Sequence, residues 1–371
     1  MSPPDQTPLA ERLRARIRRE GAISFRDWMT AALYDERDGY YRRPDRARWG
    51  RGGDYRTSPE RSPLFAATFA RRFAALHHEL GAPREWAILE AGAGAGDFAR
   101  VALETLERDH PRVFRATRYY VDETSDDARL RARENLAAFA GRVEFCEDGW
   151  RGVPFAAGVI FSNELLDAFP VHRVLMRNGR LRELCVGVDA TGGFCWSEQD
   201  PTTPRLAEHF ARLGVAPAEG HVAEVNPAAG EWIGRAAAAL RRGYVVTVDY
   251  GAEAAELYQS SERRDGTLRG FRAHEFIADV LARPGEHDLT TTINWTQIRQ
   301  AGAAAGLETI SLERQDEFLL RAGALDELES LTSRLSGEAE RLRLRLGARE
   351  MILPGGLGGS FQVLVQRKRE V

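Results

Sequence analysis

Strand-like and helix-like segments alternate along much of this 371-residue chain, and this alternation limits its fold more than any other feature. From residue 86, "WAILEAGAGAGDFARVALETL" has an apolar run, a glycine-rich turn and a helical pattern, and "RATRYYVDETSDDARLRARENLAAF" repeats that order. "AAGVIFSN" and "GYVVTVDYG" are further buried runs. Strands that alternate with helices usually form a mostly parallel sheet with helices on both faces. The sequence therefore predicts a Rossmann-like α/β core.

The turn "LEAGAGAGDF" carries Gly92, Gly94 and Gly96, and Glu90 stands just before it. Glycine permits a sharp turn and a close approach of a ligand to the backbone, and the helix that follows offers free N–H groups. In a dinucleotide fingerprint the third glycine comes three positions after the second, whereas here it comes two positions after. This spacing favours S-adenosylmethionine, which has a carboxylate but no pyrophosphate, over a dinucleotide or a purely structural turn. Glu90 and the three glycines are then the candidate cofactor contacts.

Acidic residues also end the next two expected strands. In "YYVDET", either Asp122 or Glu123 is placed to accept hydrogen bonds from both ribose hydroxyls, because neighbours in a strand point to opposite faces. Glu123 is favoured; the alternative is that both acids merely precede a helix that "TSDD" caps. In "CEDGW", Asp148 is placed to accept a hydrogen bond from the adenine amino group, although an ordinary acidic turn explains it equally well.

The stretch "SNELLDAFPV" follows a fourth expected strand and sets Asn163, Glu164 and Asp167 among apolar residues. Polar groups are costly when they are buried without partners. Ligands of open α/β sheets bind in the crevice beyond the carboxyl ends of the strands. We therefore predict that these three side chains face the methyl donor and its acceptor. Helix capping or a buried salt bridge is the alternative for the two carboxylates.

The amino-acid composition limits which partners the protein can bind and where in the cell it is expected. The formal net charge is −3, so no global basic field attracts nucleic acid or an anionic membrane. No apolar run approaches the roughly 18 residues that a membrane span needs. The three cysteines are widely spread and form neither a disulfide framework nor a Cys-x-x-Cys metal site. We expect a cytoplasmic protein that holds no metal and binds no nucleic acid.

Two further observations concern the source and the N-terminus. Lys368 is the single lysine among 52 basic residues, which indicates GC-rich codon usage and a bacterial origin. The first twenty residues are rich in arginine but contain Asp5, Glu11 and Glu20, which is unlike a transit peptide. Leu9 and the apolar residues four and eight positions later share one helical face, so this segment is expected to be the first helix.

Several stretches resemble the MidA-type S-adenosylmethionine-dependent methyltransferases, whose mitochondrial members are protein-arginine methyltransferases needed for assembly of respiratory complex I. They are "ISFRDWMTAALYDERDGYY", "GGDYRTSPERSPLF", "LEAGAGAGDF", "SNELLDAFPV", "AEVNPAA" and "PGEHDLTTTINW", which together span nearly the whole chain. The resemblance implies a class I methyltransferase core that uses S-adenosylmethionine. It also implies that loop 52–60 covers the cofactor, with Asp54 and Thr57 as contacts.

The chain departs from the family pattern near the cofactor turn. Ala95 and Asp97 stand where the family usually has Arg and Thr, and Asp126 replaces a Pro. The glycines of the turn and Glu123 remain, so the resemblance still implies a complete cofactor site. Asp97 adds a negative charge near the turn, and the sequence leaves open whether Ala95 and Asp97 alter cofactor affinity.

The function expected from these patterns is transfer of a methyl group to a nitrogen of a protein arginine side chain. A guanidinium stays protonated, so it needs carboxylates to pair with it and orient it. Glu164 is the first candidate and Asp167 the second, while Asn163 would orient the acceptor through its carbonyl oxygen. Two alternatives stay open: a small-molecule methyltransferase of a biosynthetic pathway, and a non-catalytic assembly factor with the same fold. The sequence also leaves the oligomeric state open, with a homodimer as one candidate.

The expected organisation has four consecutive parts. Residues 1–80 form an N-terminal helical cap with the cofactor-covering loop, and residues 81–251 form the Rossmann-like core. Residues 252–295 are a substrate-side insertion, and residues 296–371 complete the core sheet. The alternating stretch "SFQVLVQRK" in the last part is expected to be an edge strand.

Overall fold

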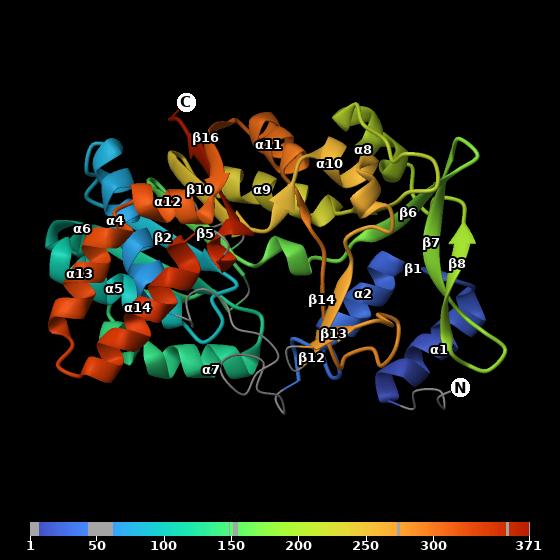
Figure 1. The fold of residues 1–371 in the computed structure, drawn as a ribbon, viewed down its shortest axis with the longest axis horizontal. Coiled ribbons are helices and arrows are strands. Elements are labelled where there is room, and N and C mark those ends of the chain that lie inside the picture. Colours follow the sequence, from blue (N-terminus) through green and yellow to red (C-terminus); the bar gives the residue numbers. More distant parts are fainter. Residues whose placement is uncertain are drawn as a thin grey trace. The chain divides into compact units, whose positions relative to one another are not determined.

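The computed structural model describes residues 7–43, 62–147, 149–150, 155–272, 275–353 and 356–370 (Figure 1). Asp54, Thr57 and Asp148 lie outside the described residues. The chain divides into two compact units. The N-terminal unit comprises the described residues of Met1–Tyr55, Leu166–Glu231 and Gly251–Gln300, and the core unit those of Arg56–Leu165, Trp232–Tyr250 and Ala301–Val371. This grouping differs from the four consecutive parts expected from the sequence, because residues 166–231 group with the N-terminal residues.

The core unit contains a seven-stranded sheet with the order β16-β17-β10-β5-β2-β3-β4. Five of its strands run parallel: β2 (Trp86–Ala91), β3 (Thr117–Asp122), β4 (Val143–Phe145), β5 (Gly158–Asn163) and β10 (Gly243–Asp249). Strand β17 (Gln362–Lys368) runs antiparallel between β10 and β16 (Leu307–Arg314). The predicted α/β fold with a mostly parallel sheet is confirmed.

The prediction of an edge position for the last strand is wrong. Strand β17 pairs with β10 on one side and with β16 on the other, and its residues Val363, Leu364 and Val365 are all buried. An alternating pattern does not distinguish an outer strand from an inner one when both faces of the sheet are covered. The partner strand β16 covers the edge that the sequence pattern leaves open.

Aromatic side chains join the helices of the core unit to its sheet. Helix α4 (Pro63–Glu79) begins where the Ser62 hydroxyl accepts a hydrogen bond from the Leu64 N–H, with a proline in its first turn. Its Phe69 contacts Phe161 of β5, and Phe161 stacks on Phe98 of α5 (Asp97–Asp109) with 4.4 Å between ring centroids. Such a pair contributes about 0.5–1.5 kcal/mol beyond the burial of its area. This cluster supports the strands whose ends form the candidate site.

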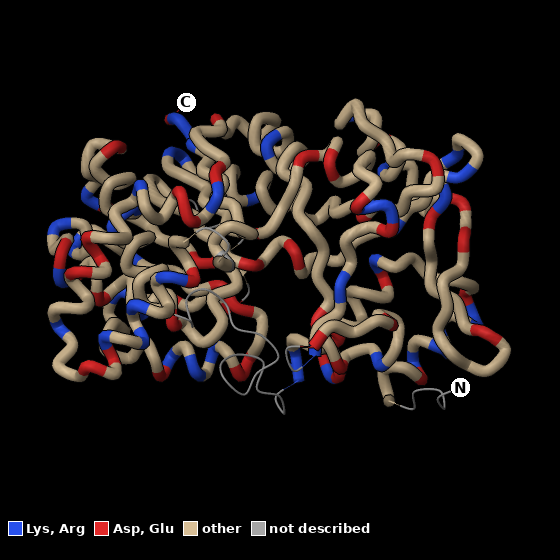
Figure 2. The backbone as a smooth tube through the Cα atoms, viewed as in Figure 1, with Lys and Arg blue, Asp and Glu red and all other residues tan. Residues whose placement is uncertain are grey.

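The remaining helices of the core unit follow the strands in chain order. They are α6 (Pro111–Ala116), α7 (Asp126–Asn135), the later part of α9 (Pro227–Ala239), α12 (Gln315–Arg321), α13 (Ala324–Arg334) and α14 (Glu338–Ile352) (Figure 1). Acidic and basic residues are interspersed along these helices (Figure 2). Buried side chains of α12, α13 and α14 belong to the same hydrophobic cluster as those of α4 and α5.

The N-terminal unit begins with α1 (Pro8–Glu20), and the predicted apolar face is confirmed because Leu9, Leu13 and Ile17 are buried. Helix α2 (Phe25–Tyr34) follows the short strand β1 (Ile23–Ser24). An antiparallel sheet then has the order β1-β7-β6-β9, with β8 (Phe194–Gln199) paired to β7. Its other strands are β6 (His172–Arg177), β7 (Arg180–Val188) and β9 (Val222–Val225).

Residues 252–295 add smaller elements to the N-terminal unit. They include α10 (Ala254–Gln259) and a three-stranded sheet of β12 (Arg269–Arg272), β13 (Glu275–Ile277) and β14 (Asp288–Thr290). Helix α8 (Arg205–Leu213) and the first part of α11 (Trp295–Ala304) also belong to this unit. Within the described residues, no helix is both long and apolar enough to cross a membrane.

Candidate cofactor and methyl-transfer site

The strand order of the core sheet reverses between the neighbouring strands β2 and β5, so their carboxyl ends form a topological switch point. Strand β2 lies beside β5, with Ala91 opposite Ser162. From β2 the chain proceeds to β3 and β4 on one side, whereas from β5 it proceeds to β10 on the other side. Such a switch point is where open α/β sheets bind their ligands. The glycine turn follows β2 directly, and Asn163 ends β5, so the fold brings two separately predicted motifs to one place.

The glycine turn has a backbone conformation that other residues rarely adopt. The φ angles of Gly92, Gly94 and Gly96 are 72°, 55° and 79°. A Cβ atom on Gly92 would lie 3.0 Å from the Cδ1 atom of Leu165, so the turn packs closely on the segment after β5. The N–H groups of Gly92 and Ala93 both donate to the carbonyl oxygen of Asp122, at 2.8 and 3.2 Å. The turn is therefore fixed against the end of β3.

Glu123 reaches back to the same turn. Its Oε2 atom accepts a hydrogen bond from the N–H of Gly94, and its Oε1 atom accepts one from the N–H of Ser125, both at 2.8 Å. The Ser125 hydroxyl caps α7, as the stretch "TSDD" predicts. Asp122 binds the turn through its main-chain carbonyl oxygen, which accepts the two hydrogen bonds from the start of the turn. The carboxylate of Glu123 thus bonds to the backbone of the turn, and its contact with ribose stays a prediction.

The Asn163–Glu164 pair shows two features of a binding position. The amide Nδ2 of Asn163 donates to Oε1 of Glu164 at 3.0 Å, whereas its Oδ1 atom is buried and accepts no hydrogen bond from the described residues. Glu164 has a φ of 51°, although it is not glycine, and its N–H donates to the carbonyl of Val248. Such a conformation costs about 1–3 kcal/mol and is typical of functional sites. A buried oxygen without a donor is open to a ligand N–H.

A family model of S-adenosyl-L-methionine-dependent methyltransferases matches residues 68–312, which is more than half of the chain. The chain belongs to this methyltransferase family. A protein from Burkholderia thailandensis, whose crystal structure holds S-adenosyl-homocysteine, is 30% identical and has a TM-score of 0.87. That similarity covers 100% of this chain and 96% of the other.

Curated relatives point in the same direction. The chain is 25% identical to the mitochondrial protein arginine methyltransferase NDUFAF7 homolog of Drosophila melanogaster, over 98% of this chain and 88% of that protein. It is 24% identical to the mitochondrial protein arginine methyltransferase NDUFAF7 of Homo sapiens, over 96% and 82% of the two chains. These similarities confirm the prediction of an S-adenosylmethionine-dependent methyltransferase and the family resemblance, and they disfavour a dinucleotide enzyme.

Glu90 of the methyltransferase lies beneath the turn, inside the core. It shares a face of β2 with Trp86 and Ile88, and it is only 5% exposed. The Tyr119 hydroxyl donates to its Oε2 atom at 2.7 Å. Burial, together with the nearby charges of Glu123 and Asp97, raises the pKa of Glu90 to about 8. Its carboxyl is therefore mostly protonated at neutral pH, and direct contact of Glu90 with the cofactor stays a prediction.

Asp167 of the methyltransferase groups with the N-terminal unit, whereas Asn163 and Glu164 belong to the core unit. It lies in a short 3-10 segment (Leu166–Ala168) and is buried, and its carbonyl oxygen accepts a hydrogen bond from the N–H of Thr291. A joint action of Asp167 with Glu164 stays a prediction that rests on their proximity in sequence.

Asp249 is a further acidic residue at the carboxyl end of the core sheet. It ends β10 and is fully buried, and Val248 just before it pairs with Asn163 of β5. Its Oδ1 atom accepts a hydrogen bond from the N–H of Tyr250. The stretch "VVTVDYG" carries the sequence signal for this position, because an acidic residue closes an apolar run there.

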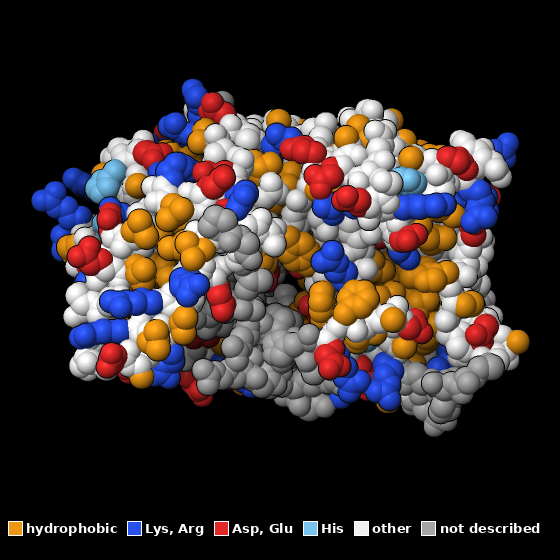
Figure 3. Space-filling model, viewed as in Figure 1, with side chains coloured by type: hydrophobic (Ala, Val, Ile, Leu, Met, Phe, Trp, Pro, Cys, Tyr) orange, Lys and Arg blue, Asp and Glu red, His pale blue; other side chains and the backbone are white. Residues whose placement is uncertain are grey.

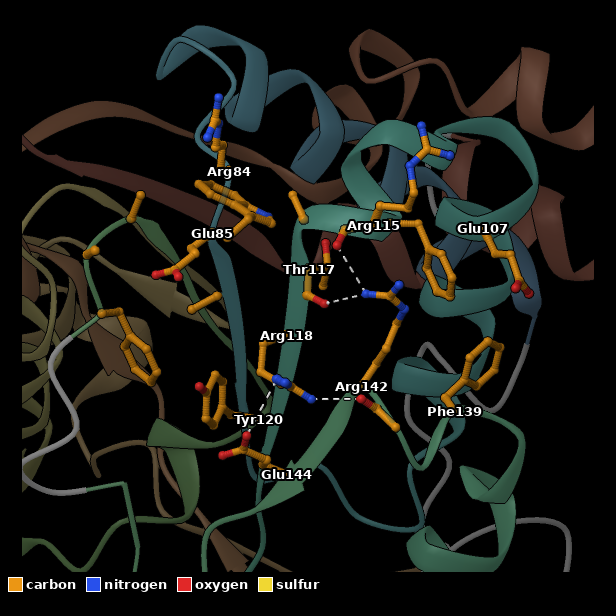
Figure 4. Close-up of a pocket in the computed structure, with 18 of the residues that line it drawn as sticks. Arg84, Glu85, Glu107, Arg115, Thr117, Arg118, Tyr120, Phe139, Arg142 and Glu144 are labelled. Atoms are coloured by element: carbon orange, nitrogen blue, oxygen red, sulfur yellow. Dashed lines mark hydrogen bonds and ion pairs between the residues drawn. The ribbon is translucent and has the colours of Figure 1, made fainter.

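A pocket of about 850 Å³ opens at the other end of the core sheet, at the amino ends of β2 and β3 (Figure 4). Arg142 donates there to the carbonyl oxygens of Arg115 and Thr117, and Arg118 donates to that of Gly141. These guanidiniums are already bonded to the backbone. The pocket is separate from the candidate cofactor site, because the glycine turn lies at the carboxyl end of β2. Among the described residues, no cluster of His, Cys, Asp and Glu is arranged to hold a metal ion.

Proposed function

We propose that this methyltransferase transfers the methyl group of S-adenosylmethionine to a nitrogen of an arginine side chain in a protein. The observation that carries the proposal is the Asn163–Glu164 pair. The Glu164 backbone has a positive φ, and the buried Oδ1 atom of Asn163 accepts no hydrogen bond from the residues that the structure describes. A guanidinium supplies both a positive charge and several N–H donors, so it fits this pair better than an uncharged acceptor does. The names of the fly and human relatives support the same acceptor.

The residues around the glycine turn fit the cofactor. Gly92, Gly94 and Gly96 present backbone that no side chain of their own covers, and the proposed ribose ligand is Glu123, with Asp122 as the alternative. Glu90, just before the turn, is proposed as a further cofactor contact. The proposed contacts of Asp54, Thr57 and Asp148 lie outside the described residues. The cofactor, when bound, supplies a methyl group already activated by a cationic sulfur, so the protein contributes mainly position and exclusion of water.

The chain's own residues act on the acceptor. Glu164 binds the guanidinium through its carboxylate, and the Asn163 Nδ2 bond keeps that carboxylate in one orientation. Asn163 accepts an N–H of the acceptor at its Oδ1 atom. The attacking nitrogen gains the methyl group and loses one proton, and the proposed proton acceptor is Glu164. Asp167 is proposed as the second carboxylate for the guanidinium.

The test uses the purified full chain, methyl-labelled S-adenosylmethionine and a cell extract that lacks the enzyme. The expected result is label in proteins, recovered as methylarginine after acid hydrolysis and lost with Glu164→Gln. Label that appears only in small molecules would contradict the arginine proposal and favour a biosynthetic methyltransferase. A chain that gives no binding heat with S-adenosylmethionine in calorimetry would instead favour an assembly factor without catalysis.

We further propose that the protein works in the cytoplasm of a bacterium. The support is compositional, since only one of the 52 basic residues is lysine, which indicates GC-rich codon usage. The fly and human relatives are named as mitochondrial proteins, so the two groups would differ in location. Fractionation of the source cells with a specific antibody tests this; enrichment in a membrane or organelle fraction would contradict it.

A further inference from the structure

Exposed large apolar side chains concentrate on three consecutive helices of the core unit. Eight such side chains are exposed in the described part of the chain, and five of them lie between residues 320 and 353. These five are Leu320, Leu325, Leu342, Leu346 and Leu353, with exposed fractions from 44% to 58%. Figure 3 shows hydrophobic side chains gathered on the face over α12, α13 and α14. Single exposed leucines are ordinary, whereas a cluster marks an interaction surface.

The exposed leucines on helix α14 are regularly spaced along the helix. Leu344, Ala348 and Met351 are buried on its inner side. Leu342 and Leu346 are one turn apart on the outer side, and Leu353 continues their stripe just beyond the last turn. The helix therefore exposes an apolar stripe on the side opposite to the one that packs in its own core.

Charges flank this stripe in a fixed order along the helix. Glu338 lies in the first turn and Arg349 in the last turn, and both fall on the side of Leu342 and Leu346. Both side chains are exposed, and neither forms an ion pair with another residue in the part of the chain that the structure describes. The order from the start of the stripe to its end is thus acid, leucine, leucine, base.

We propose that α14 pairs antiparallel with α14 of a second copy of this chain, about a two-fold axis. In an antiparallel pairing centred between Leu342 and Leu346, Leu342 of each copy lies against Leu346 of the other copy. The same pairing sets Glu338 of each copy beside Arg349 of the other. A two-fold interface joins one surface to itself, and this order of charges is self-complementary. The antiparallel arrangement also aligns the two helix dipoles favourably.

The first test measures the dissociation constant of the full chain by sedimentation equilibrium. The expected result is a wild-type dimer, and Leu342→Asp is expected to raise the dissociation constant at least about tenfold, because a charge would enter the apolar centre. Leu130→Asp is the matched control, since Leu130 is 63% exposed on α7, outside the stripe. A wild-type chain that is monomeric at about 100 μM would overturn the proposal, as would equal weakening by the two substitutions.

The second test exploits the charge order. Glu338→Arg and Arg349→Glu are each expected to weaken the dimer, because each sets like charges side by side at both ends of the helix pair. The double variant restores opposite charges and is expected to return the dissociation constant to within about threefold of the wild type. A dimer unaffected by either single change, or a double variant as weak as the singles, would refute the antiparallel pairing. Circular dichroism melts of all variants establish that the fold is retained.

Discussion

The backbone N–H of Gly94 donates a 2.8 Å hydrogen bond to the carboxylate of Glu123, which lies 29 residues later in the chain. This bond joins the turn after β2 to the end of the neighbouring strand β3. The second carboxylate oxygen of Glu123 accepts the N–H of Ser125 at the same distance. Both oxygens of one side chain are thus oriented by backbone donors, so the carboxylate is positioned before any ligand arrives.

Glu123→Gln should weaken binding of S-adenosylmethionine at least about tenfold. An amide has only one oxygen, so its NH₂ group would face either the Gly94 or the Ser125 N–H, and a charge-assisted bond worth about 1.5–3 kcal/mol is lost. Calorimetry of cofactor binding measures the change. Asp122→Asn is the control and should have a smaller effect, because Asp122 holds the turn through its backbone. Equal affinities for wild type and Glu123→Gln would remove Glu123 from the site.

Gly94→Val should abolish detectable cofactor binding. The φ of Gly94 is 55°, and a side chain at this position would stand where the proposed cofactor approaches the backbone. Gly81→Val is a matched control in the turn after α4, because Gly81 has a φ of 79° and no atom lies within 4 Å of the position that its Cβ atom would take. Both variants should lose roughly 1–2 kcal/mol of unfolding free energy. Only Gly94→Val should lose the cofactor; retained binding would place the site elsewhere.

Glu164→Gln should leave cofactor affinity within about twofold and reduce turnover at least about a hundredfold, because the charge that pairs with the acceptor is removed. Glu164→Gly should also be inactive, yet it should raise the free energy of unfolding by about 1 kcal/mol, since its φ of 51° suits glycine. Single-turnover kinetics and urea unfolding measure the two effects. An active Glu164→Gly variant would show that turnover does not require the carboxylate of Glu164.

Glu90 should make the stability of the protein depend on pH. Burial raises its pKa from 4.5 to about 8, so the folded state binds this proton more tightly than the unfolded state does. The stabilisation is complete below about pH 4.5 and is lost as the pH rises through about 8. Urea unfolding at pH 5 and pH 9 should show a smaller pH difference for Glu90→Gln than for the wild type. An unchanged difference would mean that Glu90 ionises normally.

Local chemistry explains why much of the site was predictable. Glycine is strongly favoured wherever φ is positive, so three alternating glycines after an apolar run indicate a tight turn regardless of the rest of the chain. The period of two along a strand indicated that only one of Asp122 and Glu123 could face the cofactor. Glu123 was favoured, and its carboxylate does bond to the turn. The apolar face of α1 was equally predictable, because Leu9, Leu13 and Ile17 recur at helical spacing.

Contacts between distant residues decided the rest. An alternating pattern in β17 cannot reveal that β16 covers its outer edge, and an acidic residue before a turn cannot reveal that Tyr119 of the next strand donates to a buried Glu90. Nor do the leucines of α14 show from spacing alone which of them the fold leaves uncovered. Short-range patterns encode φ and the face of a helix or strand, since these depend on neighbours in the chain. Strand order, burial and the shift in a pKa depend on which remote segments pack together, and the packing of the whole chain sets them.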